Sequence, residues 1–171
     1  MSEQRQPHSA LATFNEVWVS TVCLVSQSLR LGGLNREAVL QLSAVRILVV
    51  DDFALFRQFV VELLGMRPEM QVVGEARDGL EAVHRAVELR PDVILLDTHL
   101  PNLNGVEVAR QLRSLAPESK IIFLTHEFSA DVVEDAFRQG ARGYVTKTRA
   151  QADLFGAVEA VTSGNTFVSD P

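Results

Sequence analysis

The segments ILVVDD (residues 47–52) and VILLD (residues 93–97) decide the fold of this chain. Each is a short run of apolar side chains that stops at an aspartate. A third run, IIFLT (residues 121–125), has the same character and ends in a threonine. Unbroken apolar runs of this length are typical of strands covered on both faces of a parallel sheet. The sequence therefore predicts a buried parallel sheet.

Apolar runs alternate with stretches of helical period from residue 46 onward. Strands are predicted at residues 46–50, 71–75, 93–96, 120–124 and 143–146. A helix is predicted after each strand because apolar residues recur there at helical spacing. The predicted apolar faces are Phe56, Phe59, Val60, Leu63 and Leu64; Leu80, Val83 and Val87; Val108, Leu112 and Leu115; Val133, Ala136, Phe137 and Gly140; and Leu154, Ala157, Val158 and Val161. This alternation predicts an α/β fold, a (βα)5 doubly wound parallel sheet.

The order of the strands follows from their composition. The second and fifth strands mix apolar residues with Gly, Glu and Thr, which predicts that they lie at the edges of the sheet. Right-handed crossovers with those edges give the order 2-1-3-4-5. Ligands of such sheets bind beyond the carboxyl ends of the strands, at the switch point between the first and third strands.

Polar side chains lie at the carboxyl ends of the predicted strands. Asp51 and Asp52 end the first strand, Asp97 ends the third, Thr125 the fourth and Lys147 the fifth. Carboxylate oxygens are ligands that Mg²⁺ prefers, so these residues predict a site of the type that binds Mg²⁺. Lys147 adds a positive charge at this edge, which is suited to pair with an anionic ligand. Crowded carboxylates raise at least one pKa unless a metal or the lysine compensates their charge.

Four motifs with their spacings carry a family resemblance: ILVVDD, VILLDTHLPNLNG (residues 93–105), IIFLTHE (121–127) and GARGYVTK (140–147). Together they resemble a response-regulator receiver domain of two-component signalling, with the flavodoxin-like fold of CheY and most similar to the NarL/FixJ type. The resemblance covers about residues 45–165. It implies that the chain is a phosphoacceptor in a phosphorelay, with no enzymatic activity beyond its own phosphorylation and dephosphorylation.

The resemblance also implies a role for each residue at the strand ends. Asp97 accepts a phosphoryl group from a sensor histidine kinase or a phosphotransfer protein, and a homodimer is compatible with the family. Mg²⁺ is bound by Asp51, Asp52, Asp97 and the backbone carbonyl of His99. Thr125 is the switch hydroxyl, Tyr144 is the switch aromatic residue, and Lys147 pairs with the phosphate.

Two positions depart from the family pattern. His126 stands where a small residue is usual, and Thr148 follows Lys147 where many receivers have proline. We hypothesise that His99 and His126 tune the lifetime of the acyl phosphate at the mouth of the crevice. The alternative is that both are solvated histidines without a role.

Three other functions compete with the receiver. An aspartyl-phosphate hydrolase of the haloacid-dehalogenase type needs a second aspartate two residues after the nucleophile, where this chain has His99. A flavin-binding module needs a phosphate cradle after the first strand, where Asp51 and Asp52 would repel the phosphate. A receiver-like interaction module that works without phosphorylation stays open, with His126 as its support.

The composition limits which binding partners and which cellular compartment we expect. The chain has 22 acidic and 16 basic residues, a formal charge of -6, so no sequence-independent contact with nucleic acid is expected. Cys23 is the only cysteine, which excludes an intramolecular disulfide. The apolar stretch at residues 11–25 is interrupted by polar residues and is too short to span a bilayer. We expect a cytoplasmic protein without a membrane partner.

Three regions are predicted along the chain. Residues 1–44 have no counterpart in the resemblance and are left unassigned; weak order is expected, and an authentic extension and a misplaced translation start both fit. Residues 45–165 form the receiver domain. Residues 166–171 look like the start of a linker or a tail, which in NarL/FixJ-type regulators leads to a helix-turn-helix DNA-binding domain. The sequence leaves open whether this is a part of a transcription factor or a stand-alone receiver.

Overall fold

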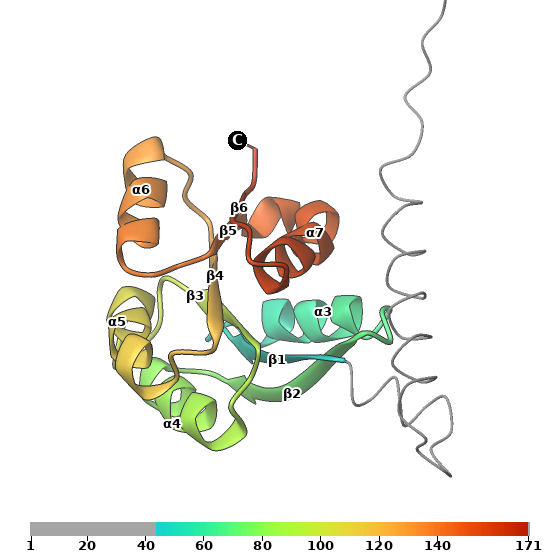
Figure 1. Ribbon diagram of the computed structural model, residues 1–171, viewed down its shortest axis with the longest axis horizontal. Helices are drawn as coiled ribbons and strands as arrows, with labels where there is room; N and C mark the ends of the chain where they lie inside the picture. Colours follow the sequence, from blue (N-terminus) through green and yellow to red (C-terminus); the bar gives the residue numbers. More distant parts are fainter. Residues whose placement is uncertain (1–43, 171) are drawn as a thin grey trace, which may run out of the picture. The chain divides into compact units, whose positions relative to one another are not determined.

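The computed structural model describes residues 44–170, so the prediction for the N-terminal extension lies outside the described residues. Strands and helices alternate along this part of the chain, as Figure 1 shows. The strands are β1 (Val45–Val50), β2 (Met70–Ala76), β3 (Val93–Asp97), β4 (Lys120–Thr125), β5 (Gly143–Thr146) and β6 (Phe167–Val168). The helices are α3 (Ala54–Leu64), α4 (Gly79–Leu89), α5 (Gly105–Leu115), α6 (Ala130–Arg138) and α7 (Ala150–Thr162), with a short 3-10 helix, η1 (Lys147–Arg149), before α7.

All strands lie in one parallel sheet in the order β2-β1-β3-β4-β5-β6. The predicted α/β class and the order 2-1-3-4-5 are therefore confirmed. The prediction that the fifth strand lies at an edge is wrong, because β6 pairs with β5 in parallel. A strand of two residues is too short to show a period in the sequence, and the segment was predicted only as a linker or tail.

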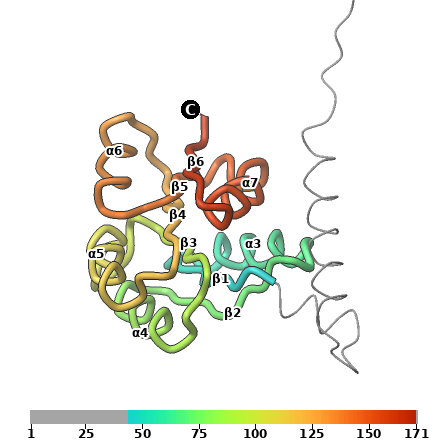
Figure 2. The backbone as a smooth tube through the Cα atoms, in the orientation of Figure 1, coloured from blue at the N-terminus to red at the C-terminus, as the bar shows by residue number. Residues whose placement is uncertain are grey.

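The sheet separates two hydrophobic layers because successive side chains of a strand point to opposite faces. In β1, Leu48 and Val50 face one layer, while Ile47 and Val49 face the other. Helices α4, α5 and α6 cover the first face, and α3 and α7 cover the second, as the ribbon and the tube both show (Figures 1 and 2). The central strands are thus buried on both sides, as their apolar runs predict.

The predicted apolar face of α4 is wrong at two of its three residues, and Val83 alone of the three packs against the core. Leu80 and Val87 are 61% and 45% exposed, whereas the buried side of α4 consists of Gly79, Ala82 and Ala86. Small residues let this helix lie close to the sheet and to α5, so its larger side chains do not mark its core face. Three further residues of the predicted faces lie outside the core: Phe59 of α3 and Leu115 of α5 are 37% and 52% exposed, and Gly140 lies beyond the end of α6 with φ +102°.

Gly105 opens α5 directly beside the carboxyl end of β3. A Cβ atom at this position would overlap the carbonyl oxygen of Asp97 and crowd the backbone of Thr98. The side chain of Asn104 caps the helix by accepting from the backbone N of Glu107 at 2.9 Å. Close approach, and not a positive φ, is therefore what requires glycine here, and it ties α5 to the aspartate at the end of β3.

We expect Gly105→Ala to lower the free energy of unfolding by about 2 kcal/mol, because the added methyl group must displace backbone atoms. Urea denaturation followed by circular dichroism measures the change. Gly65→Ala is the matched control, because Gly65 ends α3 with φ -62° and has ordinary contacts of 3.4 Å around the added Cβ. The control should be neutral or slightly stabilising, and an equal loss in both variants would contradict the prediction.

Candidate functional site

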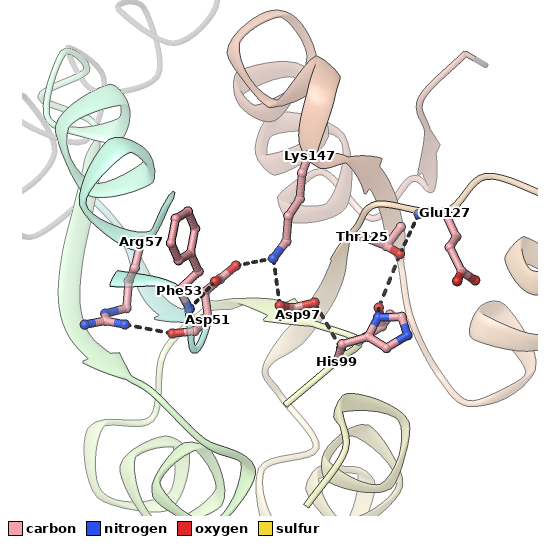
Figure 3. Close-up of polar contacts among 9 residues, drawn as sticks. Asp51, Phe53, Arg57, Asp97, His99, Thr125, Glu127 and Lys147 are labelled. Atoms are coloured by element: carbon pink, nitrogen blue, oxygen red, sulfur yellow. Dashed lines mark hydrogen bonds and ion pairs between the residues drawn. The ribbon is translucent and has the colours of Figure 1, made fainter. Parts of the chain in front are cut away.

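The carboxyl edge of the sheet gathers the polar residues that end separate strands. Asp51 follows β1, Asp97 ends β3, Thr125 ends β4, and Lys147 directly follows β5. Figure 3 shows Lys147 reaching between Asp51 and Asp97, with Thr125 on the neighbouring strand. All four residues are buried, because they lie at the ends of strands that helices cover on both faces.

Lys147 forms a buried ion pair with two carboxylates at once. Its Nζ lies 2.7 Å from Oδ2 of Asp51 and 2.7 Å from Oδ2 of Asp97. Only the contact with Asp97 also has hydrogen-bond geometry, so Oδ2 of Asp51 has no hydrogen-bond partner among the described residues. The ring of Phe56 lies 4.9 Å from the same Nζ and adds a cation–π contact.

Burial and charge act in opposite directions on this pair. Burial raises the pKa of Asp51 above its usual value, and the ion pair with Lys147 offsets only part of that effect. Burial by itself would lower the pKa of Lys147, but Asp51 and Asp97 together raise it. The lysine is therefore protonated near neutral pH, and it partly neutralises a crowded acidic site.

The acidic residues also fit a divalent cation. One carboxylate oxygen each of Asp51, Asp52 and Asp97 lies within 4.8 Å of the others, and Asp52 is the exposed member. Oxygen ligands of this kind suit Mg²⁺, which commonly keeps several waters. Oδ2 of Asp51, which makes the ion pair with Lys147 but no hydrogen bond among the described residues, is a buried acceptor for such an ion. These side chains therefore provide a suitable donor set beside the ion pair.

A chain of hydrogen bonds leads from Asp97 to Thr125. The backbone N of His99 donates to Oδ1 of Asp97 at 3.0 Å. Thr98 Oγ1 lies 3.0 Å from Nδ1 of His99 and donates to Thr125 Oγ1 at 3.2 Å. Thr125 Oγ1 also accepts from the backbone N of Glu127 at 3.1 Å. The Thr125 hydroxyl thus accepts twice, which leaves its own proton to donate.

Tyr144 lies fully buried in β5, beside β4. Its hydroxyl donates to the backbone oxygen of Glu127 at 2.8 Å, and its ring meets Phe128 edge-on with centroids 6.4 Å apart. Burial raises the pKa of its hydroxyl. Thr125 and Tyr144 therefore hold the same segment, Thr125 through the N–H of Glu127 and Tyr144 through its carbonyl.

The remaining predicted residues lie at the rim. His99 and His126 are both exposed; His99 contacts Thr98, whereas the side chain of His126 has no hydrogen bond among the described residues. Sequence reasoning missed Thr98 and assigned Phe56 only to a helix face. It also missed Arg57, whose guanidinium donates to the backbone oxygen of Asp51 at 2.8 Å. A threonine after an aspartate and an arginine on a helix give no distinctive signal, so only the tertiary contacts reveal them.

Comparison with known proteins agrees with this geometry. The family model of the response regulator receiver domain matches residues 47–159. The chain belongs to this family. This assignment favours the receiver domain over the phosphatase and flavin-binding alternatives. Within the described part of the receiver chain, no helix has both the length and the apolar composition needed to cross a bilayer.

Relatives of this receiver domain include transcriptional regulators. The DNA-binding transcriptional activator DevR/DosR of Mycobacterium tuberculosis is 40% identical over 126 residues, which is 74% of this chain and 58% of that protein. The protein-glutamate methylesterase/protein-glutamine glutaminase of Thermotoga maritima is 44% identical over 112 residues, 64% of this chain and 32% of the relative. The chain thus spans little more than half of the activator and a third of the methylesterase, so the similarity concerns the receiver part.

Solved structures show the same fold. A response regulator of the LuxR family from Aurantimonas sp. SI85-9A1 superposes with a TM-score of 0.70 at 35% identity, over 73% of this chain and 89% of that chain. The signal receiver domain of NarL from Mycobacterium tuberculosis superposes with a TM-score of 0.68 at 33% identity, over 72% and 99%. The receiver domain is therefore similar to the NarL type, as its motifs predict.

We expect Asp51→Asn to raise the free energy of unfolding at pH 7 in the presence of a chelator. A raised carboxyl pKa means that ionised Asp51 costs folding free energy at neutral pH. That cost vanishes when the pH falls below the unfolded value of 3.8, so the gain should shrink as the pH approaches that value. Urea denaturation between pH 3 and 7 measures it, and a loss of stability at pH 7 would contradict the assignment.

Proposed function

We propose that Asp97 accepts a phosphoryl group from a sensor histidine kinase or a phosphotransfer protein, in a Mg²⁺-dependent reaction. The observation that carries this proposal is the 2.7 Å contact between Lys147 Nζ and Asp97 at the carboxyl edge of the sheet. A lysine in this position pairs with the acidic cluster before phosphorylation and with a phosphoryl oxygen afterwards. Family membership supports the same chemistry.

The chain's own residues supply positioning and charge. A carboxylate oxygen of Asp97 attacks phosphorus, an O–P bond forms, and the bond from phosphorus to the donor's nitrogen breaks. Because phosphoryl transfer depends mainly on alignment and charge neutralisation, the ammonium of Lys147 is well placed to stabilise a phosphoryl oxygen. Mg²⁺ held by Asp51, Asp52, Asp97 and the carbonyl of His99 would neutralise further negative charge on the phosphoryl group.

Thr125 and Tyr144 then carry the change to the surface. The hydroxyl proton of Thr125 is free to donate to a phosphoryl oxygen, since both of its acceptor positions are used. Movement of Thr125 disturbs the N–H of Glu127, whose carbonyl accepts from Tyr144. The acyl phosphate carries about two negative charges where the carboxylate carried one, and its new oxygens attract donors, which biases such a two-state equilibrium.

We propose transcriptional regulation as the output, in the manner of the relatives named as transcriptional regulators. The surface of α6, β5 and α7 is the switched face, and a homodimer is the expected assembly. A phosphorylation-independent interaction module is the second candidate. Exposed His126 at the rim favours it, because a bulky side chain there restricts access to Asp97.

We expect incubation with acetyl phosphate and Mg²⁺ to add one phosphoryl group to the wild-type chain, measured by intact mass. Asp97→Asn should add none, because an amide is no nucleophile for phosphorus. A chelator should also abolish the addition. Asp131→Asn, a change at an exposed aspartate in the first turn of α6, is the matched control and should react normally. No addition to the wild type under any condition would make the interaction module the leading candidate.

We expect His126→Ala to shorten the half-life of the phosphorylated form. The imidazole at the rim restricts the approach of water to the acyl phosphate, and alanine opens that path. Phosphorylated protein is freed of the donor, and the loss of the phosphoryl group is followed by mass over time. His84→Ala is the control, because His84 lies exposed on α4. Equal decay rates in wild type and His126→Ala would refute the tuning role.

A further inference from the structure

A buried serine follows β6 at the edge of the sheet. Ser169 is only 2% exposed, and its backbone N donates to the oxygen of Tyr144 at 2.8 Å. Its hydroxyl accepts from the backbone N of Thr146 at 3.4 Å and donates to Oδ2 of Asp153 at 2.7 Å. The side chain therefore continues the pairing of β5 and β6 by one step, where the strand itself has ended.

Asp153 belongs to the first turn of α7 and is held from two sides. Besides the serine hydroxyl, its carboxylate accepts from Nε of Arg149 at 2.9 Å and from a terminal guanidinium nitrogen of Arg149 at 3.3 Å. These contacts lower the pKa of Asp153, with the arginine as the main cause and burial acting against it. The three side chains thus connect η1, α7 and the segment after β6.

The same contacts reach the residue that precedes Lys147. Thr146 is buried, pairs with Thr125 across β4 and β5, and places Lys147 directly over the acidic cluster. Its backbone N–H has Ser169 as its partner on the other side. Thr146 therefore lies between the phosphoacceptor edge and the C-terminal segment of the described chain.

We propose that Ser169 is a positioning residue, which fixes Lys147 over Asp97 through Asp153 and the backbone of Thr146. By the same contacts, the pairing of β6 depends on the state of the Asp97 site. A lysine has a flexible four-carbon stem, so the place of its ammonium group depends on how firmly its backbone is anchored. Without the hydroxyl, the buried N–H of Thr146 loses its partner, and Asp153 keeps only its contacts with Arg149. The functional part of this inference rests on the proposed phosphorylation of Asp97.

Coupling of this kind is reciprocal. The Ser169 contacts stabilise the paired position of Lys147 by some coupling free energy. A change in the partners of Lys147 must then shift the equilibrium between formed and broken Ser169 contacts by that same coupling free energy. The element with two arrangements is β6, a strand of two residues at the sheet edge, with Val168 41% exposed. Short edge elements of this kind open more readily than core strands.

The first test compares rates of phosphoryl incorporation from acetyl phosphate at saturating Mg²⁺. Ser169→Ala should lower the rate by about fivefold or more, and should leave the dissociation constant of Mg²⁺ unchanged, because the predicted ligands are untouched. Ser169→Thr keeps the hydroxyl and should restore most of the rate. Ser119→Ala is the matched control: Ser119 donates to the oxygen of Pro91 at 2.6 Å, before β4 and therefore at the opposite end of the sheet.

The two serine-to-alanine variants separate positioning from stability. Both lose a hydroxyl hydrogen bond, so both should lose some stability in urea denaturation. Only Ser169→Ala should also react more slowly. Equal rates in wild type and Ser169→Ala, or an equal decrease in Ser119→Ala, would overturn the proposal.

The second test needs no phosphate. Amide hydrogen exchange at Phe167 and Ser169 is measured in wild type, Lys147→Met, Ser169→Ala and the double variant. Lys147→Met should speed exchange at these two amides by about fivefold or more. The same substitution should have much less effect in the Ser169→Ala background. Exchange at the amide of Arg142, before the other end of β5, should stay unchanged. An unaltered rate at Phe167 and Ser169 in Lys147→Met would overturn the coupling. If the wild type takes up no phosphoryl group and exchange still responds to Lys147→Met, the proposed function fails and the coupling stands.

Discussion

The buried ammonium of Lys147 between Asp51 and Asp97 is the interaction on which the rest of the site depends. Burying one ion alone is very costly, and crowding two carboxylates adds repulsion. Each group therefore makes the burial of the others tolerable, and the raised pKa of Asp51 shows that the compensation is incomplete. A site that keeps residual negative charge, with a buried carboxylate oxygen that makes an ion pair but no hydrogen bond, is suited to further positive charge.

The parallel sheet is what makes this arrangement possible. Strands β1, β3, β4 and β5 run in one direction, so residues far apart in the sequence end at one edge. The two apolar layers keep these ends rigid and mostly dry. Within this frame hydrogen bonds connect Thr98, which follows Asp97, to Thr125, and connect Thr125 and Tyr144 to the segment at Glu127.

The edge of the sheet connects the site to the end of the described chain. Ser169 takes the place of a backbone partner for Thr146, Asp153 accepts from its hydroxyl, and Arg149 donates to Asp153. This polar network lies on the opposite side of β5 from Thr125. The strand that precedes Lys147 is thus flanked by hydroxyl groups on both sides, that of Thr125 toward the acidic site and that of Ser169 toward the C-terminal segment.

The sequence by itself determined the α/β class, the strand order up to β5 and the residues at the strand ends, because long apolar runs and strand-terminal charges are local signals. It did not determine β6, whose two residues show no period, or the core face of α4, where small residues such as Ala82 and Ala86 allow close packing. Only the tertiary structure decided which groups meet: Phe56 at Lys147, Thr98 at Thr125 and Ser169 at Thr146. Such contacts join residues of different elements that are far apart in the sequence, and no spacing along the chain encodes them.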